Sequence, residues 1–356
     1  MERYCVIMAG GIGSRFWPLS KNNYPKQFLD VLGTGKSFIR ATFERFLPLV
    51  PPEHFLVVTN AAYRQLVLEQ LPELKADQVL CEPMRRNTAP CIAYATWHIL
   101  SQCPEASVAV TPADHLVTNE REFQRVIGQG LDFVEGHRDA LMTIGIKPSR
   151  PETGYGYIEV DGAQGQAQPT ASYTLPTKVK TFKEKPDLET AKQFLAAGNF
   201  FWNSGIFLWS TDAIMTAFRQ YLPDMAALFD EGRDAFGTPD EQAFIDRQFE
   251  RCENISIDYG IMERSQSRYT VAADFGWSDI GTWGSLYTHA AHDDHANAVN
   301  GHAVIVDTRD SVVNIEPGYE AIIQGLDHCL VALRDHSLLV CRLDDEQQIK
   351  HWVENL

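Results

Sequence analysis

Short apolar runs alternate with amphipathic segments along the first 150 residues of the chain. Runs of β-branched and aliphatic residues predict strands, whereas apolar positions three or four apart predict helices. Because strands and helices take turns, the pattern predicts an α/β fold with a doubly wound sheet. The strands expected here are 4–8, 55–58, 78–82, 107–111 and 141–145, and the helices are 63–71, 87–101 and 123–134.

The rest of the chain is richer in predicted strands. Residues 156–160 and 178–182 read as strands, and residues 188–197 and 212–221 as helices. From residue 301 onward, short apolar runs recur roughly every ten residues, which indicates a small all-β unit followed by a terminal helix over 346–355. The runs are 303–306, 312–315, 321–323, 329–333 and 338–343. We therefore expect two domains, residues 1–290 and residues 291–356.

A glycine-rich segment follows the first predicted strand. Glycine has no Cβ, so the backbone can adopt positive φ and bring its N–H groups close to an anion. Arginine and lysine side chains nearby suit phosphate groups. A glycine triplet by itself is more often an ordinary turn between a strand and a helix. The segment contains Gly10, Gly11, Gly13, Ser14, Arg15 and, further along, Lys26.

Two common nucleotide motifs do not fit. Phe16 stands where a G-x-G-x-x-G motif needs its third glycine, which disfavours a dinucleotide site and a nicotinamide oxidoreductase. Residues 33–37 look like the end of a P-loop, but Asp30 stands where the first glycine should be. We interpret this second segment as a turn that leads into a helix.

Composition narrows the classes of partner. The formal net charge is −16, which argues against a nucleic acid or an anionic membrane surface. The seven cysteines show no C-x-x-C spacing, which is typical of reduced thiols in a cytoplasmic protein. Neither a signal peptide nor an apolar stretch that could span a bilayer is visible. Phosphate ligands would therefore depend on local cations.

Two aspartates are candidates for binding a metal. Asp114 directly follows the strand predicted at 107–111, where its carboxylate could hold Mg²⁺ or simply cap a turn. Asp279 lies between two tryptophans in a glycine-flanked segment, where an unpaired buried carboxylate would be costly. Asp274 is the alternative carboxylate in this segment.

Other polar residues follow predicted strands and suit a nucleotide or a sugar. Glu82 could accept hydrogen bonds from a base, and Asn87 and Thr88 could donate to the base or cap a helix. Glu184 could accept from sugar hydroxyls while Lys185 meets a phosphate, although adjacent surface charges of this kind are usually only solvated. Asn203 beside a tryptophan suits a polyhydroxyl ligand or a turn that enters a strand.

Together these segments resemble a known family. The pattern Gly10-Gly11-x-Gly13-Ser14-Arg15-x-x-Pro18-Leu19 with Pro25-Lys26 is similar to the signature of the sugar-nucleotide pyrophosphorylases. Further segments resemble the bacterial mannose-1-phosphate guanylyltransferases of that family: FWPLS (16–20), YPKQF (24–28), RNTAP (86–90), PADH (112–115), WNSGIF (202–207), SIDYGIME (256–263) and GWSD (276–279). The departures are small, with Ser14 in place of the usual Thr and Phe16 in place of Leu.

The resemblance implies a Rossmann-like nucleotidyltransferase domain with a doubly wound mixed sheet, and a C-terminal unit like a short left-handed β-helix. It also implies roles for single residues. The glycine loop and Arg15 would wrap the triphosphate, Lys26 would contact the phosphates at the reacting centre, and Asp114 and Asp279 would hold Mg²⁺. The guanine would be read by Glu82, Asn87, Thr88 and Ala89, and the sugar phosphate would be held by Tyr155, Gly156, Glu184, Lys185 and Asn203.

The reaction that the resemblance implies is GTP plus mannose 1-phosphate giving GDP-mannose and pyrophosphate. Two alternatives stay open at this point. The same fold could use another nucleoside triphosphate or sugar 1-phosphate, or the protein could be a non-catalytic regulator that binds GDP-mannose. The sequence is compatible with a homodimer.

Overall fold

The computed structural model describes residues 1–11, 13–161 and 175–356, and these residues form two compact units. Unit 1 comprises Met1–Gly10, Phe43–Ala113 and Val117–Trp277, and unit 2 comprises Gly11–Thr42, Asp114–Leu116 and Ser278–Leu356. Three elements contain residues of both units: α1 (Phe38–Phe46), β5 (Leu116–Val117) and β11 (Trp277–Ser278). The domain boundary expected at residue 290 stays a prediction.

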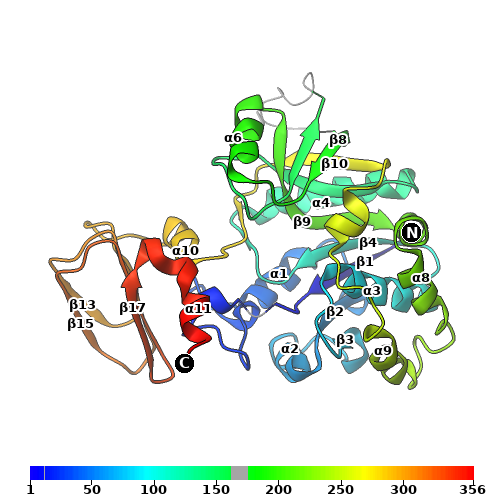
Figure 1. Cartoon of the computed structure of the whole chain (residues 1–356). Helices are drawn as coiled ribbons and strands as arrows, with labels where there is room; N and C mark the ends of the chain where they lie inside the picture. The colour runs from blue at the N-terminus through cyan, green and yellow to red at the C-terminus, as the bar shows by residue number, and fades with distance from the viewer. Residues whose placement is uncertain (12, 162–174) are drawn as a thin grey trace. The chain divides into compact units, whose positions relative to one another are not determined.

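Unit 1 is built on a nine-stranded sheet with the order β3-β2-β1-β4-β9-β6-β10-β8-β7 (Figure 1). β1 pairs in parallel with β2 and β4, whereas β9 runs antiparallel to both β4 and β6. The sheet is therefore mixed, as expected. Its strands are β1 (Glu2–Met8), β2 (Phe55–Asn60), β3 (Val79–Glu82), β4 (Ala106–Pro112), β6 (Leu141–Ile146), β7 (Tyr157–Val160), β8 (Thr177–Lys183), β9 (Phe200–Ser210) and β10 (Arg268–Ala273).

Helices cover both faces of this sheet. Successive residues of β4 point to opposite faces, and Val108 and Val110 pack in one cluster with α3 and α7. Ser107 points to the other face, where its hydroxyl donates to Glu135 of α4. The helices of unit 1 are α2 (Arg64–Gln70), α3 (Thr88–Gln102), α4 (Glu120–Gly136), α6 (Leu188–Ala197), α7 (Thr211–Tyr221), α8 (Pro223–Asp230) and α9 (Glu241–Phe249).

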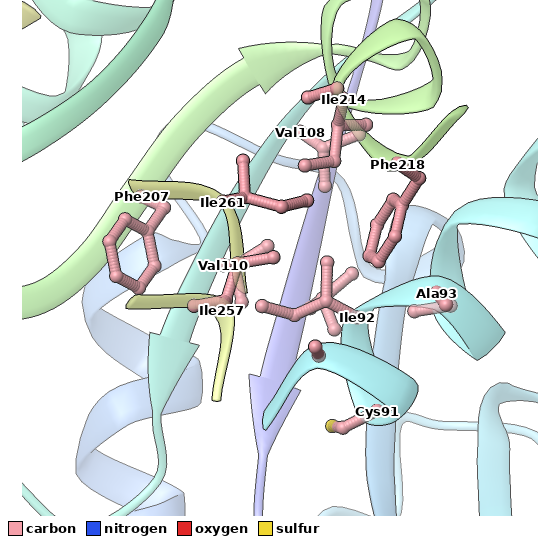
Figure 2. Close-up of a cluster of buried hydrophobic side chains, with 14 of the residues drawn as sticks. Cys91, Ile92, Ala93, Val108, Val110, Phe207, Ile214, Phe218, Ile257 and Ile261 are labelled. Carbon is pink, nitrogen blue, oxygen red and sulfur yellow. The ribbon is translucent and has the colours of Figure 1, made fainter. Parts of the chain in front are cut away.

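The largest cluster of buried side chains lies under α3 and α7. Figure 2 shows Val108 and Val110 of β4 close to Ile92 of α3, with Ile257 and Ile261 from the segment that follows α9. Both of these isoleucines are fully buried. The segment around residue 258 is therefore anchored in the core of unit 1 from both sides.

The C-terminal part of unit 2 is a stack of short strands. β12, β14 and β16 pair in parallel, β13 pairs in parallel with β15, and β17 closes the first stack in the antiparallel sense. From β12 to β16, each strand thus pairs with the next but one along the chain, which is the pattern of a coiled parallel β-structure. The strands are β12 (Ala298–Asn300), β13 (Ala303–Val306), β14 (Val312–Ile315), β15 (Ala321–Gln324), β16 (Cys329–Arg334) and β17 (Ser337–Arg342).

The core of unit 2 joins the glycine-rich segment to these strands. Phe16 and Leu29 are buried in the same cluster as Leu330 of β16 and Trp283 of α10 (Trp283–His289). Only part of the terminal helix expected over 346–355 is an α-helix, namely the short α11 (Ile349–Val353). A 3₁₀ helix (Leu343–Gln348) precedes it. Within the described part of the chain, no helix is long and apolar enough to cross a membrane.

The sequence-based interpretation of β9 needs a correction. The pattern of residues 202–207 suggests an amide that suits a polyhydroxyl ligand or a turn that enters a strand. The turn is wrong, because these residues lie inside an eleven-residue strand. Asn203, Ser204 and Gly205 interrupt the apolar run and hide its continuity. The sequence pattern also misses strand β10 and helices α8 and α9.

The packing of β9 against α4 contributes to the stability of unit 1. Leu208 of β9 is fully buried, and a Cβ on Gly130 of α4 would collide with its Cδ1 atom, so the helix and the strand are in close contact. We expect Leu208→Ala to lower the free energy of unfolding by about 2–5 kcal/mol, because lost burial and a residual cavity both contribute. Urea denaturation measures this change. The matched control, Leu188→Ala on the exposed start of α6, should change it by less than about 0.5 kcal/mol. Equal losses in the two variants would contradict this account of the core.

Candidate active site

The residues of the glycine-rich loop in unit 2 differ in backbone conformation and in the space around them. Gly13 has φ +68°, and a Cβ there would lie 2.5 Å from the Cβ of Lys26, so both backbone conformation and space require glycine. A Cβ on Gly11 would meet open space. Ser14 begins a short 3₁₀ helix (Ser14–Phe16), and Arg15 is exposed.

Lys26 is buried at the centre of unit 2's polar residues. Its side chain is only 3% exposed, and Nζ donates to the backbone oxygen of Asp114 at 2.8 Å and to Asp114 Oδ2 at 3.1 Å. Nζ also donates to the backbone oxygen of Asp279 at 2.7 Å. An ammonium group has three protons, so these three oxygens saturate it. The structure therefore brings together Lys26, Asp114 and Asp279, which lie far apart in the sequence.

Asp114 is held in its charged form. Burial alone would raise the pKa of this carboxyl, but the charges of Lys26 and His115 and the hydrogen bond from Lys26 outweigh that effect, and the pKa lies below its usual value. His115 Nε2 lies 4.0 Å from Asp114 Oδ1. The carboxylate is about one third exposed, so it stays open to a ligand.

Asp279 and Asp274 differ in their surroundings. Asp279 lies in unit 2, partly buried, and its Oδ1 accepts from the backbone N–H of Gly281 at 3.2 Å. Asp274 lies in unit 1 and is exposed. Of the two candidates, only Asp279 shares Lys26 with Asp114.

These two aspartates fit a magnesium ion in residue type. The described residues contain no group of three or more His, Cys, Asp or Glu side chains arranged to hold a metal. Mg²⁺ is usually bound by one or two carboxylates and completes its coordination with water and substrate phosphates. Asp114 and Asp279 provide two such carboxylates, and Lys26 joins the two residues through the Asp114 carboxylate and the backbone oxygens of both.

Glu82 ends strand β3 in unit 1 and is buried beside the glycine loop's first residue. A Cβ on Gly10 would lie 3.3 Å from Glu82 Oε2, and within the described residues Glu82 Oε1 has no hydrogen-bond partner. Burial raises the pKa of Glu82 to about 8, although the charge of Arg85 acts in the opposite direction. Glu82 therefore offers a buried acceptor oxygen next to Gly10.

The other residues expected to read a base have structural contacts as well. Asn87 caps α3, with its Oδ1 accepting from the N–H of Thr88 at 3.0 Å. Thr88 Oγ1 accepts from the N–H of Ile257 at 2.9 Å, and the N–H of Ala89 donates to the oxygen of Ile255 at 3.1 Å. The capping alternative is therefore realised for Asn87, and residues 255–257 hold the start of α3.

The residues expected to bind a sugar phosphate lie together in unit 1. A Cβ on Gly156 would lie 2.5 Å from Glu184 Oε2 and 3.2 Å from the Cβ of Asn203, so these three residues converge. Lys185 Nζ lies 3.3 Å from Glu184 Oε1, and the backbone N–H of Lys185 donates to the oxygen of Tyr155 at 3.2 Å. The ring of Tyr155 packs edge-on against the rings of Trp202 and Trp277.

Glu184 is the most perturbed group of this cluster. Burial raises its pKa to about 7, the negative charge of Asp258 adds to the rise, and the charge of Lys185 opposes it. Within the described residues, Glu184 Oε2 is buried without a hydrogen-bond partner. Sequence reasoning did not single out Asp258, although the segment SIDYGIME that contains it was part of the family resemblance.

Comparison with known proteins identifies the family of this chain. A family model described as nucleotidyl transferase matches residues 4–296. The mannose-1-phosphate guanylyltransferase of Escherichia coli is 35% identical, over 99% of this chain and 75% of the relative. The enzyme named mannose-1-phosphate guanylyltransferase ManC in Salmonella typhimurium is 36% identical, over 99% of this chain and 73% of the relative.

A solved structure extends the similarity to the fold. A crystal structure from Thermus thermophilus, named mannose-1-phosphate geranyltransferase, superposes with a TM-score of 0.86 at 28% identity and covers 100% of this chain and 99% of its own. The chain therefore belongs to the nucleotidyl transferase family and is similar along nearly its whole length to the mannose-1-phosphate guanylyltransferases within it, which confirms the resemblance inferred from its motifs.

Proposed function

We propose that this protein transfers GMP from GTP to mannose 1-phosphate and releases pyrophosphate. The observation that carries the proposal is the convergence of Gly156, Glu184 and Asn203, an arrangement of a buried acceptor and an amide that suits sugar hydroxyls. The names of the relatives, similar over 99% of the chain, support the same substrates.

The proposed reaction is a direct displacement. An oxygen of the sugar 1-phosphate attacks the α-phosphorus of GTP, a new P–O bond forms, and the bond from the α-phosphorus to the oxygen bridging the β-phosphate breaks as pyrophosphate leaves. The second pKa of a phosphate monoester is about 6, so the attacking oxygen is already ionised at pH 7. No residue has to remove a proton, and the work of the protein is positioning and charge stabilisation.

We assign the following roles to the residues. Gly10, Gly11, Gly13, Ser14 and Arg15 bind the triphosphate, and Glu82, Asn87, Thr88 and Ala89 hold the guanine. Tyr155, Gly156, Glu184, Lys185 and Asn203 bind the sugar phosphate. Lys26 stabilises charge at the reacting phosphates, and in the structure it also fixes Asp114 and Asp279. Asp114 and Asp279 hold Mg²⁺, which when bound neutralises phosphate charge.

Further expectations about architecture, location and assembly complete the proposal. The coiled strands β12–β17 form a left-handed β-helix like that of the family. The protein acts in the cytoplasm, without a nucleic acid or a membrane as partner. The sequence is compatible with a homodimer, and residues 1–290 form the catalytic domain.

A substrate matrix tests the proposed function. Pyrophosphate release should be fastest for GTP with mannose 1-phosphate when four nucleoside triphosphates are each combined with several sugar 1-phosphates. A faster reaction with another pair would reassign the substrates within the family. Tight binding of GDP-mannose without turnover of any pair would favour the regulatory alternative.

The role of Asp279 predicts a specific change in metal dependence. We expect Asp279→Asn to raise the Mg²⁺ concentration for half-maximal activity by at least about tenfold, because even outer-shell partners of a metal are commonly worth that much. A Mg²⁺ titration of the initial rate measures it. Asp274→Asn is the matched control and should leave the titration unchanged. If only the Asp274 variant shifts, the metal assignment is wrong.

The raised pKa of Glu82 predicts a pH dependence of GTP binding. Glu82 is largely neutral below its pKa of about 8, whereas the N–H groups of guanine need an ionised acceptor. GTP affinity should therefore rise between about pH 6.5 and pH 8.5, by up to about tenfold per pH unit below the pKa, as protons are released on binding. Titration calorimetry at several pH values measures this rise. Glu82→Gln keeps the shape of the side chain but cannot titrate, so the rise of GTP affinity with pH should disappear in this variant. An unchanged pH profile would refute the role of Glu82 in binding guanine.

A further inference from the structure

The carboxamide of Asn203 is fixed by three hydrogen bonds. Its Oδ1 accepts from Thr143 Oγ1 at 2.7 Å and from the backbone N–H of Gly205 at 3.2 Å. Its Nδ2 donates to Asp258 Oδ1 at 2.8 Å. An amide nitrogen has two N–H groups, so Asp258 takes one of them and the orientation of the amide aims the second elsewhere.

The segment that carries Asp258 is itself firmly held. Asp258 begins a short π-helix (Asp258–Met262), and the flanking Ile257 and Ile261 are fully buried in the cluster that Figure 2 shows. The buried guanidinium of Arg268 donates to the backbone oxygens of Met262 and Glu263, both at 2.8 Å, and so caps the far end.

One buried acceptor atom near Asn203, on Glu184, has no hydrogen-bond donor among the described residues. Glu184 is only 7% exposed, and its Oε2 has no partner within the described residues. A Cβ placed on Gly156 would touch both this oxygen and the side chain of Asn203. An acceptor on Glu184 and a donor on Asn203 side by side match adjacent hydroxyl groups, each of which both donates and accepts.

We propose that Asp258 is a positioning residue of the sugar-phosphate site, which sets the affinity for the sugar by holding the carboxamide of Asn203 against Glu184. The inference rests on the proposed function. Asp258 does not itself contact the sugar and acts through Asn203. Its backbone neighbours also hold Thr88 and Ala89, so the same segment supports the start of α3.

Asp258 and Glu184 also influence each other, because burial raises the pKa of Asp258 and the negative charge of Asp258, when it is ionised, raises the pKa of Glu184. The titratable groups that influence this pair are Lys185, which lowers the pKa of Glu184, and Glu263, which raises it together with Asp258. Removing the charge of Asp258 should lower the pKa of Glu184 from its value of about 7. A merely structural role of Asp258 would not move this titration.

Titration calorimetry of GDP-mannose and GDP on three variants tests the proposal. Asp258→Ala should bind GDP-mannose about tenfold more weakly and GDP with unchanged affinity, since one positioning hydrogen bond is lost. Asp258→Asn keeps an acceptor for Asn203 and should stay within about threefold of the wild type for both ligands at about pH 8. Asp234→Ala, an exposed aspartate of unit 1, is the control.

Two further measurements sharpen the outcome. The first is the pH at which the ratio of the affinities for GDP-mannose and GDP changes. In Asp258→Asn this pH should be lower than in the wild type. In the background of Asn203→Ala, adding Asp258→Ala should cause less than about a twofold further loss.

Equal loss of GDP and GDP-mannose affinity in Asp258→Ala would overturn the proposal, because it would mean general damage to the fold. An unchanged ratio of the two affinities would overturn it as well. Failure of the proposed function would instead appear in the wild type, as absent binding of GDP-mannose, and would remove this inference with it.

Discussion

The buried ammonium of Lys26 is the interaction on which the polar part of unit 2 depends. A charge with so little exposure is stable only when it is fully paired, and its three protons meet oxygens of Asp114 and Asp279. Gly13 is part of the same constraint, since any side chain there would collide with Lys26. Gly13 is thus required by the packing of the lysine as well as by its own positive φ.

The three glycines of the loop consequently have different tasks. Gly13 makes room for Lys26, Gly10 lies against the buried carboxyl of Glu82, and Gly11 borders open space. A motif read as one phosphate-binding element is therefore also a packing element in two places. In unit 1 the segment around the π-helix has a similar double task, because the backbone of Ile257 holds Thr88 while Asp258 holds Asn203.

Local sequence patterns predicted many of the strands and helices. The features that they missed depend on contacts between residues distant in sequence. The runs at 303–306 and 312–315 are strands with the same bounds, because turn residues separate them clearly. The continuity of β9 is hidden since Asn203, Ser204 and Gly205 break its apolar pattern. Motifs gave the candidate site residues, whose roles stay predictions. The hydrogen bonds of Lys26 and the bond between Asn203 and Asp258 join residues distant in sequence, and no local pattern reports such pairs.

Electrostatics shows how an acidic protein can bind anions. The chain carries a net charge of −16, yet two carboxyls assigned to substrate binding, Glu82 and Glu184, have pKa values raised to about 8 and about 7. Burial keeps them largely or partly neutral near pH 7 while no ligand is bound, which reduces repulsion of phosphates. In the proposed function, Glu82 loses its proton when guanine binds. Asp114 follows the opposite rule, because Lys26 keeps it ionised. In the proposed site, the unliganded protein therefore carries less negative charge at Glu82 and Glu184, which we assign to the base and the sugar, and keeps it at Asp114, which we assign to the cation.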